Sequence, residues 1–365
     1  MLVVKSADST PCTGFAVSRW MCSSHGNGCW GRTSEGGWRP AFAHEDASNM
    51  LADSDFTRAV AAIQRGELVA MPTETVYGLA ANALDPTAVV RIFAAKGRPR
   101  FDPLIVHVAD PEQAWDLAVA SPRARILAAA CWPGPLTLVL PRTALVPDVV
   151  TSGLDSVGIR CPDHPLARAL IRACGVPLAA PSANVFGRIS PTTAAHVAEQ
   201  LGDQVAVILD GGPCVVGIES TVIVLDPRPI ILRPGGVSRE RLEELLGEPV
   251  EVAGRTTRAD HLPKQAPGML ASHYAPRKPL TLRAAGTPWP SDPARGILAF
   301  TAAPPHVVHE ILSPRGDLAE AAMRLFACLR RLDASPATSL VAEYVPDHGL
   351  GLGINDRLRR AAGLG

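Results

Sequence analysis

The strongest constraint on the fold is an alternation of short apolar runs with segments that carry helix start and stop signals. Asp85-Pro86 can begin a helix that Gly97 ends, and Pro165 can begin another that Gly175 ends. Such capping residues satisfy the backbone groups that a helix leaves unpaired at its ends. Strands and helices that alternate at this spacing predict an α/β layer fold. The predicted strands are Leu68–Met71, Leu104–Val108, Leu136–Leu140, Val157–Arg160, Val176–Ala180, Val205–Leu209, Thr221–Leu225 and Ile230–Leu232.

The chain of 365 residues is longer than one hydrophobic core usually organises, so more than one domain is expected. Residues 1–49 hold three of the six Trp and three of the eight Cys without a helical or strand period, and we expect an appended, disordered segment. Residues 50–247 carry the α/β pattern. Five prolines interrupt residues 248–279, which predicts a linker without regular elements. Residues 280–365 form a second, smaller α/β unit.

The composition limits the partners of the chain. Its 35 Lys and Arg balance 35 Asp and Glu, so there is no net charge to attract nucleic acid or an anionic membrane over a long range. No apolar run is long enough to cross a bilayer, and the N-terminus lacks a basic segment followed by an apolar one. We therefore expect a cytoplasmic protein with local anion sites, no membrane partner and no strong direct binding of nucleic acid.

The eight cysteines do not form a disulfide framework, and most stand alone among apolar residues. Cys12, Cys22, Cys29 and His25 could together hold zinc. However, Cys22 and Cys29 are further apart than the usual pair of zinc ligands. We therefore predict no metal site made by the protein itself.

Two polar clusters follow predicted elements in the first half of the α/β pattern. P-T-E-T-V-Y-G-L, Pro72 to Leu79, comes directly after a strand, where Thr73 and Thr75 face a ligand or cap a short helix. K-G-R-P, which begins at Lys96, ends a helix. Lys96 and Arg98 there either grip phosphate oxygens or complement the helix dipole.

Two further clusters follow in the second half. P-S-A-N-V-F-G-R-I-S-P-T begins at Pro181; a turn and a helix cap at Thr192 explain its end, but Ser182 and Asn184 favour a ligand site. In G-I-E-S-T-V and I-L-R-P-G, Ser220 opens one strand and Arg233 closes another, so both can reach one cleft. The chain has no glycine-rich P-loop, no dinucleotide fingerprint and no hydrolase elbow. Any nucleotide would therefore be held by separate side chains.

Together these clusters resemble the YrdC-like family, in the two-domain form of the threonylcarbamoyl-AMP synthases. The resemblance lies in K-x-R with S-x-N, in T-E-T-V-Y-G-L, in P-L-I-V-H and in P-G-M-x-x-x-H-Y-A-P, here Pro267 to Pro276. It covers residues 54–276 closely. The resemblance implies a YrdC-like twisted mixed sheet with helices around an open cleft, followed by a smaller Rossmann-like α/β domain.

The resemblance also implies an enzyme that joins L-threonine, bicarbonate or CO2, and ATP into L-threonylcarbamoyl-AMP and pyrophosphate. The product would feed the tRNA threonylcarbamoyl transferase machinery. Carried over by motif, the threonine pocket comprises Thr75, His107, Arg160, Ser182 and Ser220. The ATP site comprises Lys96, Arg98, Asp102, Ser156, Asn184, Thr192, Arg233 and Tyr274, with Lys96 and Arg98 as the catalytic cations and Tyr274 as a lid over the nucleotide.

One residue departs from the pattern of the family. Asp102 stands in F-D-P-L where the family commonly has Asn. A carboxylate beside ATP repels phosphate unless it binds Mg2+ or pairs with Arg98 or Arg100. Mg2+ itself is expected to enter with ATP.

Two other functions remain open from the sequence. A non-enzymatic RNA-binding module of the same fold would need a basic surface, which the zero net charge does not favour. A carbamoyl-adenylate former of the hydrogenase-maturation kind would need additional acylphosphatase and Cys-rich zinc segments. The sequence contains neither of these.

Overall fold

The computed structural model describes residues 20–22, 29–32, 38–40, 54–254, 273–305 and 308–364. The chain divides into two compact units, Met1–Ala52 and Asp53–Gly365. In the first unit, β1 (Trp20–Cys22), β2 (Cys29–Arg32) and β3 (Trp38–Pro40) form an antiparallel sheet. These three segments lie within residues 1–49, where the sequence shows no strand period. Their strands are too short to show a period, although G-N-G between β1 and β2 is a hairpin signal in the sequence.

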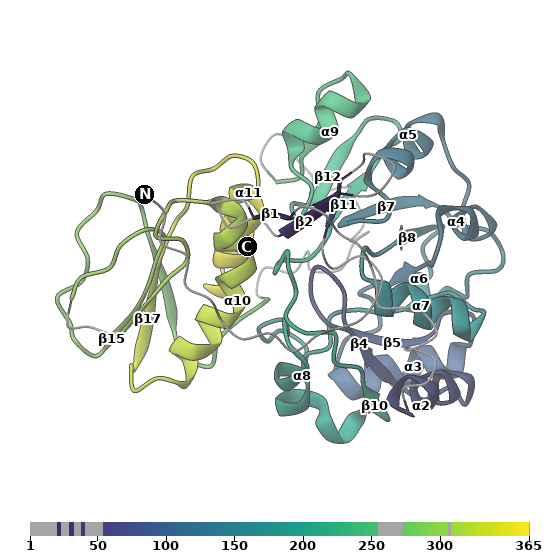
Figure 1. Ribbon diagram of the computed structural model, residues 1–365, viewed down its shortest axis with the longest axis horizontal. Coiled ribbons are helices and arrows are strands. Elements are labelled where there is room, and N and C mark those ends of the chain that lie inside the picture. Colours follow the sequence, from purple (N-terminus) through teal and green to yellow (C-terminus); the bar gives the residue numbers. More distant parts are fainter. Residues whose placement is uncertain are drawn as a thin grey trace. The chain divides into compact units, whose positions relative to one another are not determined.

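The main domain of the second unit, residues 54–254, is built on a mixed sheet (Figure 1). Parallel and antiparallel neighbours both occur in it, as the predicted fold class requires. In the described part of the chain its ten strands follow the order β10 (Val207–Ile208), β4 (Val69–Met71), β5 (Gly78–Asn82), β9 (Leu178–Ala179), β6 (Ile105–His107), β8 (Ser156–Arg160), β7 (Leu136–Pro141), β11 (Thr221–Val224), β12 (Ile230–Arg233) and β13 (Glu251–Val252).

The two faces of the central strands differ in chemistry because side chains alternate along a strand. Val106, Leu138 and Ile159 belong to the large apolar core. Their neighbours Ile105 and Val139 belong to a small separate cluster on the other face. His107 and Arg160 share that second face by the same period, so polar groups gather beside a small apolar patch.

Helices surround the sheet and begin and end largely where the capping residues predict. Asp85 caps one helix through the backbone N–H of Thr87, and Gly97 ends it with φ 60°. Thr193, rather than Thr192, caps α8 because its hydroxyl accepts from His196 N. The helices are α2 (Ser54–Gln64), α3 (Pro86–Lys96), α4 (Pro111–Leu117), α5 (Pro122–Cys131), α6 (Asp148–Thr151), α7 (Pro165–Cys174), α8 (Ala194–Leu201), the 3-10 turn η1 (Gly202–Gln204) and α9 (Arg239–Leu246).

Two strands of the main domain lie where none was predicted. β5 begins at the end of the T-E-T-V-Y-G-L cluster, with Gly78, and pairs with β4 and β9. β13 lies in the predicted linker and pairs with β12 at the sheet edge, so the expectation that residues 248–279 hold no regular element is wrong at their start. Proline density misled there, because the two residues of β13 lie in the proline-free stretch between Pro249 and Pro263 and can pair as a strand.

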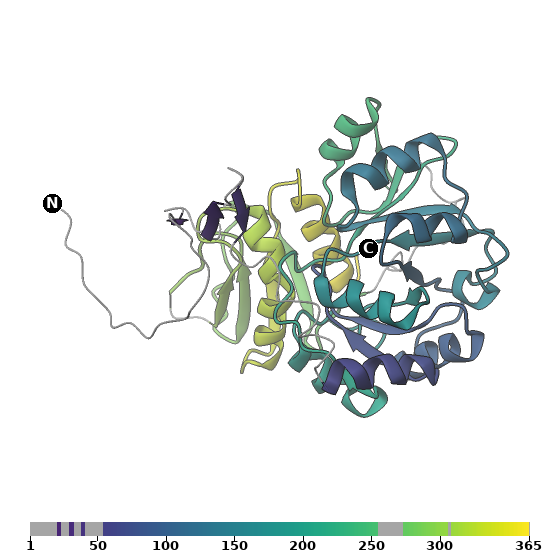
Figure 2. The ribbon, with the colours of Figure 1, turned by 45° about the vertical axis from the view of Figure 1, so that its right-hand side comes forward.

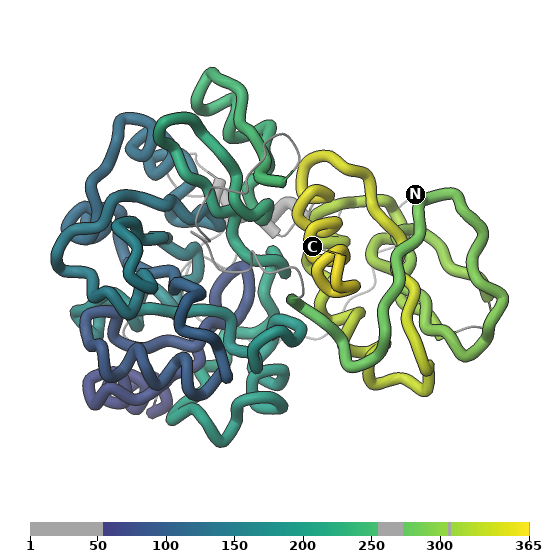
Figure 3. Tube along the Cα trace, turned by 180° about the vertical axis from the view of Figure 1, so that it is seen from behind, coloured from purple at the N-terminus to yellow at the C-terminus, as the bar shows by residue number. Residues whose placement is uncertain are grey.

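The small domain, residues 273–364, contains a parallel sheet in the order β14 (Leu280–Arg283), β17 (Ser339–Glu343), β15 (Arg295–Ala299) and β16 (His309–Ile311). α10 (Leu318–Ala334) and α11 (Gly351–Ala361), in yellow tones, lie together beside this sheet (Figures 1, 2 and 3). The smaller α/β unit expected from the sequence is therefore present. Among the described residues, no helix is both long and apolar enough to cross a membrane.

Candidate active site

A cavity of about 40 Å³ lies on the polar face of the main sheet. Both domains contribute to its lining, which contains an unusual share of cations and hydroxyls for a buried space. The lining residues are Val76, Arg98, Ile105, His107, Arg160, Ala180, Pro181, Ser182, Glu219, Ser220, Arg233, His273 and Tyr274. A cavity of this volume admits only about one or two waters, so a larger ligand must displace the side chains that cover it.

His107 and Arg160 are the last residues of the parallel neighbours β6 and β8, and they are paired in register. Arg160 Nη2 lies 2.7 Å from Glu74 Oε2, and both side chains are buried. Burial and the neighbouring Arg160 lower the pKa of His107 to about 3, so its imidazole is neutral at physiological pH. The two strand ends thus offer a neutral imidazole and a guanidinium already oriented by a carboxylate.

Thr73 and Thr75 form a buried turn after β4 instead of capping a helix. Their hydroxyl oxygens are 2.8 Å apart, and Thr73 Oγ1 also donates to Val76 O at 2.6 Å. The next side chain, Val76, lines the cavity, whereas Thr75 does not. The hydroxyls therefore shape this turn, and the assignment of Thr75 to a threonine pocket stays a prediction.

Lys96 ends α3 and is almost fully buried. Its Nζ donates to the carbonyl oxygens of Ser182 and Asn184, the latter at 2.5 Å. Asn184 Nδ2 in turn donates to Val185 O and Arg188 O, while its Oδ1 has no hydrogen-bond partner. Burial and the nearby Arg98 lower the pKa of Lys96 well below its ordinary value. Lys96 thus fixes the S-A-N loop, and neither it nor Asn184 lines the cavity in this structure.

Arg98 lines the cavity and is held by its own loop. Its Nη2 lies 2.9 Å from Asp102 Oδ2, and Nε donates to Asp102 O at 3.1 Å. Of the alternatives open for Asp102, the structure therefore shows pairing with Arg98. Burial lowers the pKa of Arg98, and the carboxylate of Asp102 opposes that effect.

Ser220 and Arg233 meet across the antiparallel strands β11 and β12, as their positions in the sequence predict. Arg233 Nη2 donates to Ser220 O at 3.0 Å and to Ser220 Oγ at 3.2 Å. Ser220 Oγ also lies 2.8 Å from Thr137 Oγ1. Both Ser220 and Arg233 line the cavity, so this corner supplies a hydroxyl and a guanidinium together.

His273 and Tyr274 cover the cavity from the end of the predicted linker. Their rings contact edge to face at 4.1 Å, and Tyr274 also contacts Phe326 of α10 at 5.6 Å. Tyr274 adopts φ 62°, a conformation that costs a non-glycine residue about 1–3 kcal/mol unless its surroundings hold it. Tyr274 therefore both lines the site and packs the two domains together. Pro267, Gly268 and Met269 lie outside the described residues.

Like Lys96, Asp102 and Asn184, the predicted ATP residues Ser156 and Thr192 do not line this cavity. Ser156 lines a neighbouring space of about 10 Å³ with Thr137. Thr192 is buried, and its hydroxyl lies 3.4 Å from His196 Nδ1 on α8. Motif position alone placed both residues at the nucleotide, but the loop that carries Thr192 turns toward its own helix.

Glu74, Glu219 and His273 lie at the site although the sequence analysis gave them no role. All three residues fall within the motifs named above, so the sequence contained the signal that could have found them. Glu74 pairs with Arg160, which lines the cavity, and Glu219 pairs with Arg357 of α11. In the described part of the chain, no three His, Cys, Asp or Glu side chains gather closely enough to hold a metal ion. Cys12 and His25 lie outside that part.

A mixed sheet with a buried cleft of guanidiniums, hydroxyls and a neutral imidazole defines a protein of the YrdC-like class, suited to small anionic ligands. The Sua5/YciO/YrdC family model, described as telomere recombination, matches residues 61–235. The model of the threonylcarbamoyl-AMP synthase C-terminal domain matches residues 237–363.

Similar proteins span nearly the same length. The threonylcarbamoyl-AMP synthase of Bacillus subtilis is 43% identical over 87% of this chain and 96% of its own. The synthase of Pyrococcus abyssi is 43% identical over 82% of this chain and 92% of its own. A solved structure of P. abyssi Sua5 complexed with L-threonine has a TM-score of 0.77 and 39% identity, covering 88% of this chain and 96% of that one. The chain belongs to the threonylcarbamoyl-AMP synthase family.

Proposed function

We propose that the chain makes L-threonylcarbamoyl-AMP and pyrophosphate from L-threonine, bicarbonate or CO2, and ATP. The observation that carries this function is 43% identity over almost the full length of a named threonylcarbamoyl-AMP synthase. The similar P. abyssi structure complexed with L-threonine supports the amino acid as substrate. The enzyme is therefore a nucleotidyltransferase that acts in tRNA modification.

The chemistry needs no covalent enzyme intermediate. The amine of threonine attacks CO2 and loses a proton, which gives a carbamate. A carbamate oxygen then attacks the α-phosphorus of ATP, and pyrophosphate leaves with the electron pair of the broken P–O bond. Because carboxylate, carbamate and triphosphate repel one another, the protein must position them and neutralise their charge.

The polar face of the sheet offers groups of the required kind. Arg98 and Arg233 line the cavity and are suited to phosphate oxygens. His107, Arg160 and Ser182 line its other wall and are suited to the amino acid, with Arg160 as the partner of its carboxylate. Lys96 supports the reaction indirectly, because its Nζ holds the S-A-N loop through the carbonyl oxygens of Ser182 and Asn184. Opening of the His273-Tyr274 cover admits the nucleotide.

Magnesium is assigned to the substrate, as MgATP. The described residues gather no cluster of ligands for it, and Asp102 already pairs with Arg98. When bound, the ion would neutralise phosphate charge. The protein groups would hold and orient the nucleotide around it.

The transferase that acts on tRNA is the proposed consumer of the product. The cytoplasm is the proposed compartment, because the three substrates and tRNA occur there. A stable RNA-binding module is a weaker proposal. The guanidiniums of Arg98, Arg160 and Arg233 are nearly inaccessible, whereas binding to a nucleic-acid backbone requires exposed cations.

Incubation of the full-length chain with labelled L-threonine, bicarbonate and ATP tests the proposal. We expect threonylcarbamoyl-AMP and pyrophosphate in equal amounts. Serine, which lacks the methyl group, should be a poor but measurable substrate, since a missing methyl is worth about 1–3 kcal/mol. Valine should be rejected more strongly because it leaves a buried hydrogen-bonding group without its partner. RNA binding without pyrophosphate release would contradict the proposal.

A further inference from the structure

Two segments that form one corner of the cavity are covered by the small domain. Residues 217–220 lead into β11 and carry Glu219 and Ser220, and residues 233–235 leave β12 and carry Arg233. Hydrogen bonds from Arg233 to Ser220 join the two segments. The positions of Ser220 and Arg233 therefore depend on how the small domain packs against these two segments.

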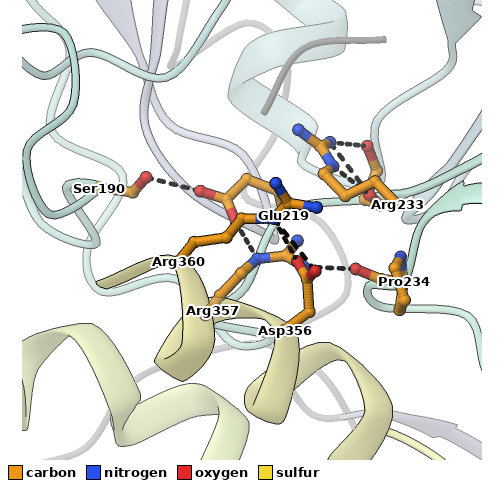
Figure 4. A network of polar contacts seen from close by, with 8 residues as sticks. Ser190, Glu219, Arg233, Pro234, Asp356, Arg357 and Arg360 are labelled. Atoms are coloured by element: carbon orange, nitrogen blue, oxygen red, sulfur yellow. Dashed lines mark hydrogen bonds and ion pairs between the residues drawn. The ribbon is translucent and has the colours of Figure 1, made fainter. Parts of the chain in front are cut away.

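Arg357 of α11 reaches this corner from the small domain (Figure 4). Its side chain exposes none of its surface, and its Nε donates to Glu219 Oε2 at 2.9 Å. Nη1 of the same guanidinium donates to the carbonyl oxygen of Pro234. The Arg357 side chain thus contacts both residues 217–220 and residues 233–235, the two segments that the Arg233–Ser220 hydrogen bonds join.

Glu219 is fixed from two directions. Ser190 Oγ donates to its Oε1 at 2.5 Å, while Arg357 holds its Oε2. Burial alone raises the pKa of Glu219, but the charges of Arg357 and Arg233 outweigh burial and keep that pKa below its ordinary value. The carboxylate is therefore ionised, and Arg357 is its bonded counter-charge. Asp356 in turn pairs with Arg357 at 3.0 Å and with Arg360 at 3.0 Å.

The backbones of the two domains also approach too closely for additional atoms. A Cβ added at Gly217 would lie 2.3 Å from Met323 Cα of α10. A Cβ added at Gly353 of α11 would lie 3.0 Å from Ile218 Cδ1 and 3.3 Å from Gly235 Cα. Glycine is required where two backbones meet at such distances. These contacts press α10 and α11 against both segments independently of the ion pairs.

The same guanidinium also faces the cover of the cavity. Arg357 Cζ lies 5.4 Å from the centre of the Tyr274 ring, within the range of a cation–π contact. The Tyr274 ring also lies 5.6 Å from the ring of Phe326. Arg357 therefore contacts the fixed wall of the site and its cover.

We propose that Arg357 is a positioning residue for the synthase reaction, through which the small domain fixes Ser220 and Arg233 against ATP and threonine. It acts through Glu219 and the Pro234 carbonyl and touches no substrate. The inference rests on the proposed function, because it assigns a role within that reaction. It makes the small domain a structural part of the active site.

Arg357→Met in the full-length chain tests this role against a matched control, Arg330→Met. Arg330 also links α10 to the main domain, with its Nη2 donating to Ile189 O at 2.6 Å, but its partners Ile189 and Glu199 lie outside residues 217–220 and 233–235. We expect Arg357→Met to lower kcat/KM for ATP at least tenfold and Arg330→Met to stay within twofold of the wild type. If the wild type itself makes no threonylcarbamoyl-AMP, the proposed function fails; if it does and the two variants match, the positioning role is wrong.

A second measurement does not depend on turnover. Amide hydrogen exchange of residues 217–221 and 233–237 should rise in Arg357→Met and remain at the wild-type level in Arg330→Met. The double variant Glu219→Gln with Arg357→Met should regain at least threefold activity over Arg357→Met, because it removes the buried carboxylate left without its counter-charge. Unchanged exchange, or no recovery in the double variant, overturns the proposal. If Arg357→Met does not fold, Arg357→Lys and its control Arg330→Lys are compared by the same two measurements, kcat/KM for ATP and amide exchange.

Discussion

The two faces of the central strands of the main sheet are built on different principles. One face carries Val106, Leu138 and Ile159 into an apolar core that is complete within the main domain. The other carries His107 and Arg160 into a polar cavity that is complete only when His273, Tyr274 and the Arg357–Glu219 pair are in place. A buried apolar face is satisfied by any well-packed neighbour, whereas buried charges need specific partners. The small domain supplies one of these partners, Arg357, which pairs with Glu219.

Leu138→Ala on the apolar face should produce the largest loss of stability. Removing a fully buried Leu side chain costs about 2–5 kcal/mol, since it loses apolar burial and leaves a cavity. The folded fraction should keep its kcat/KM, because Leu138 faces away from the site. Chemical denaturation and activity at a low denaturant concentration measure both effects. A large loss of kcat/KM in fully folded protein would mean that the two faces are not separate.

Arg98→Ala on the polar face should have the opposite signature. We expect kcat/KM for ATP to fall by about 10²-fold or more, equivalent to about 2.7 kcal/mol, because a cation beside the phosphates is lost. Threonine binding should change less. Steady-state kinetics with each substrate varied in turn provides the measurement. If the ATP kinetics of the variant equal those of the wild type, Arg98 does not bind phosphate and serves only the structure at the end of α3.

Tyr274→Ala should uncouple ATP hydrolysis from product formation, because the phenol ring covers the cavity. A loss of coupling of about tenfold is expected as water reaches the carbamate and the adenylate. Tyr274→Phe retains the ring contact with Phe326 and is the matched control, expected to remain coupled. The ratio of pyrophosphate to threonylcarbamoyl-AMP measures coupling. If Tyr274→Ala only lowers the melting temperature, Tyr274 serves as packing between the domains.

His107 should make the protein less stable in acid. Its pKa is about 3 in the folded state and about 6.5 when unfolded, so the unfolded state binds more protons between these values. The free energy of unfolding should therefore fall as the pH decreases from about 6.5, by up to about 1.4 kcal/mol per pH unit for this group. His107→Asn should show a shallower slope across that range. Burial also lowers the pKa of His273, so some slope should remain. Identical slopes would contradict a buried neutral imidazole.

Removal of residues 1–49 should have the smallest effect, since these residues belong to a different compact unit from the main sheet. Contacts divide the chain between Ala52 and Asp53, close to this point. A chain beginning at Met50 is expected to fold with an unchanged melting temperature and unchanged kcat/KM. Loss of most activity would show that the first unit contributes to the enzyme.

Much of the main domain follows from local signals. The caps of α3 and α7 and the strands that lead to His107 and Arg160 lie where the sequence predicts them, because capping and apolar runs act within a few residues. β5 was missed because it begins inside T-E-T-V-Y-G-L, whose sequence is typical of a loop. Its strand conformation depends on pairing with β4 and β9, which local sequence does not indicate. β13 was missed because two residues carry no period.

The candidate site was predicted in part. The motifs assigned Arg98 and Arg233 to the ATP site. They assigned His107, Arg160 and Ser220 to the threonine pocket. All five residues line one cavity in the structure. The motifs did not separate these residues from Ser156 and Thr192, whose side chains turn elsewhere. Motif spacing identifies a loop, but the packing of that loop decides which way each side chain points.

The sequence by itself determined the α/β alternation, the capped helices and the set of cations and hydroxyls available for an anion site. These properties depend on short-range backbone chemistry and on residue type. Only the tertiary structure decided which charges are paired. Arg357 lies 138 residues from Glu219 in the chain, and nothing in either local sequence indicates the other. Their pairing arises because α11 packs on residues 217–220 and 233–235, where desolvation makes a counter-charge necessary.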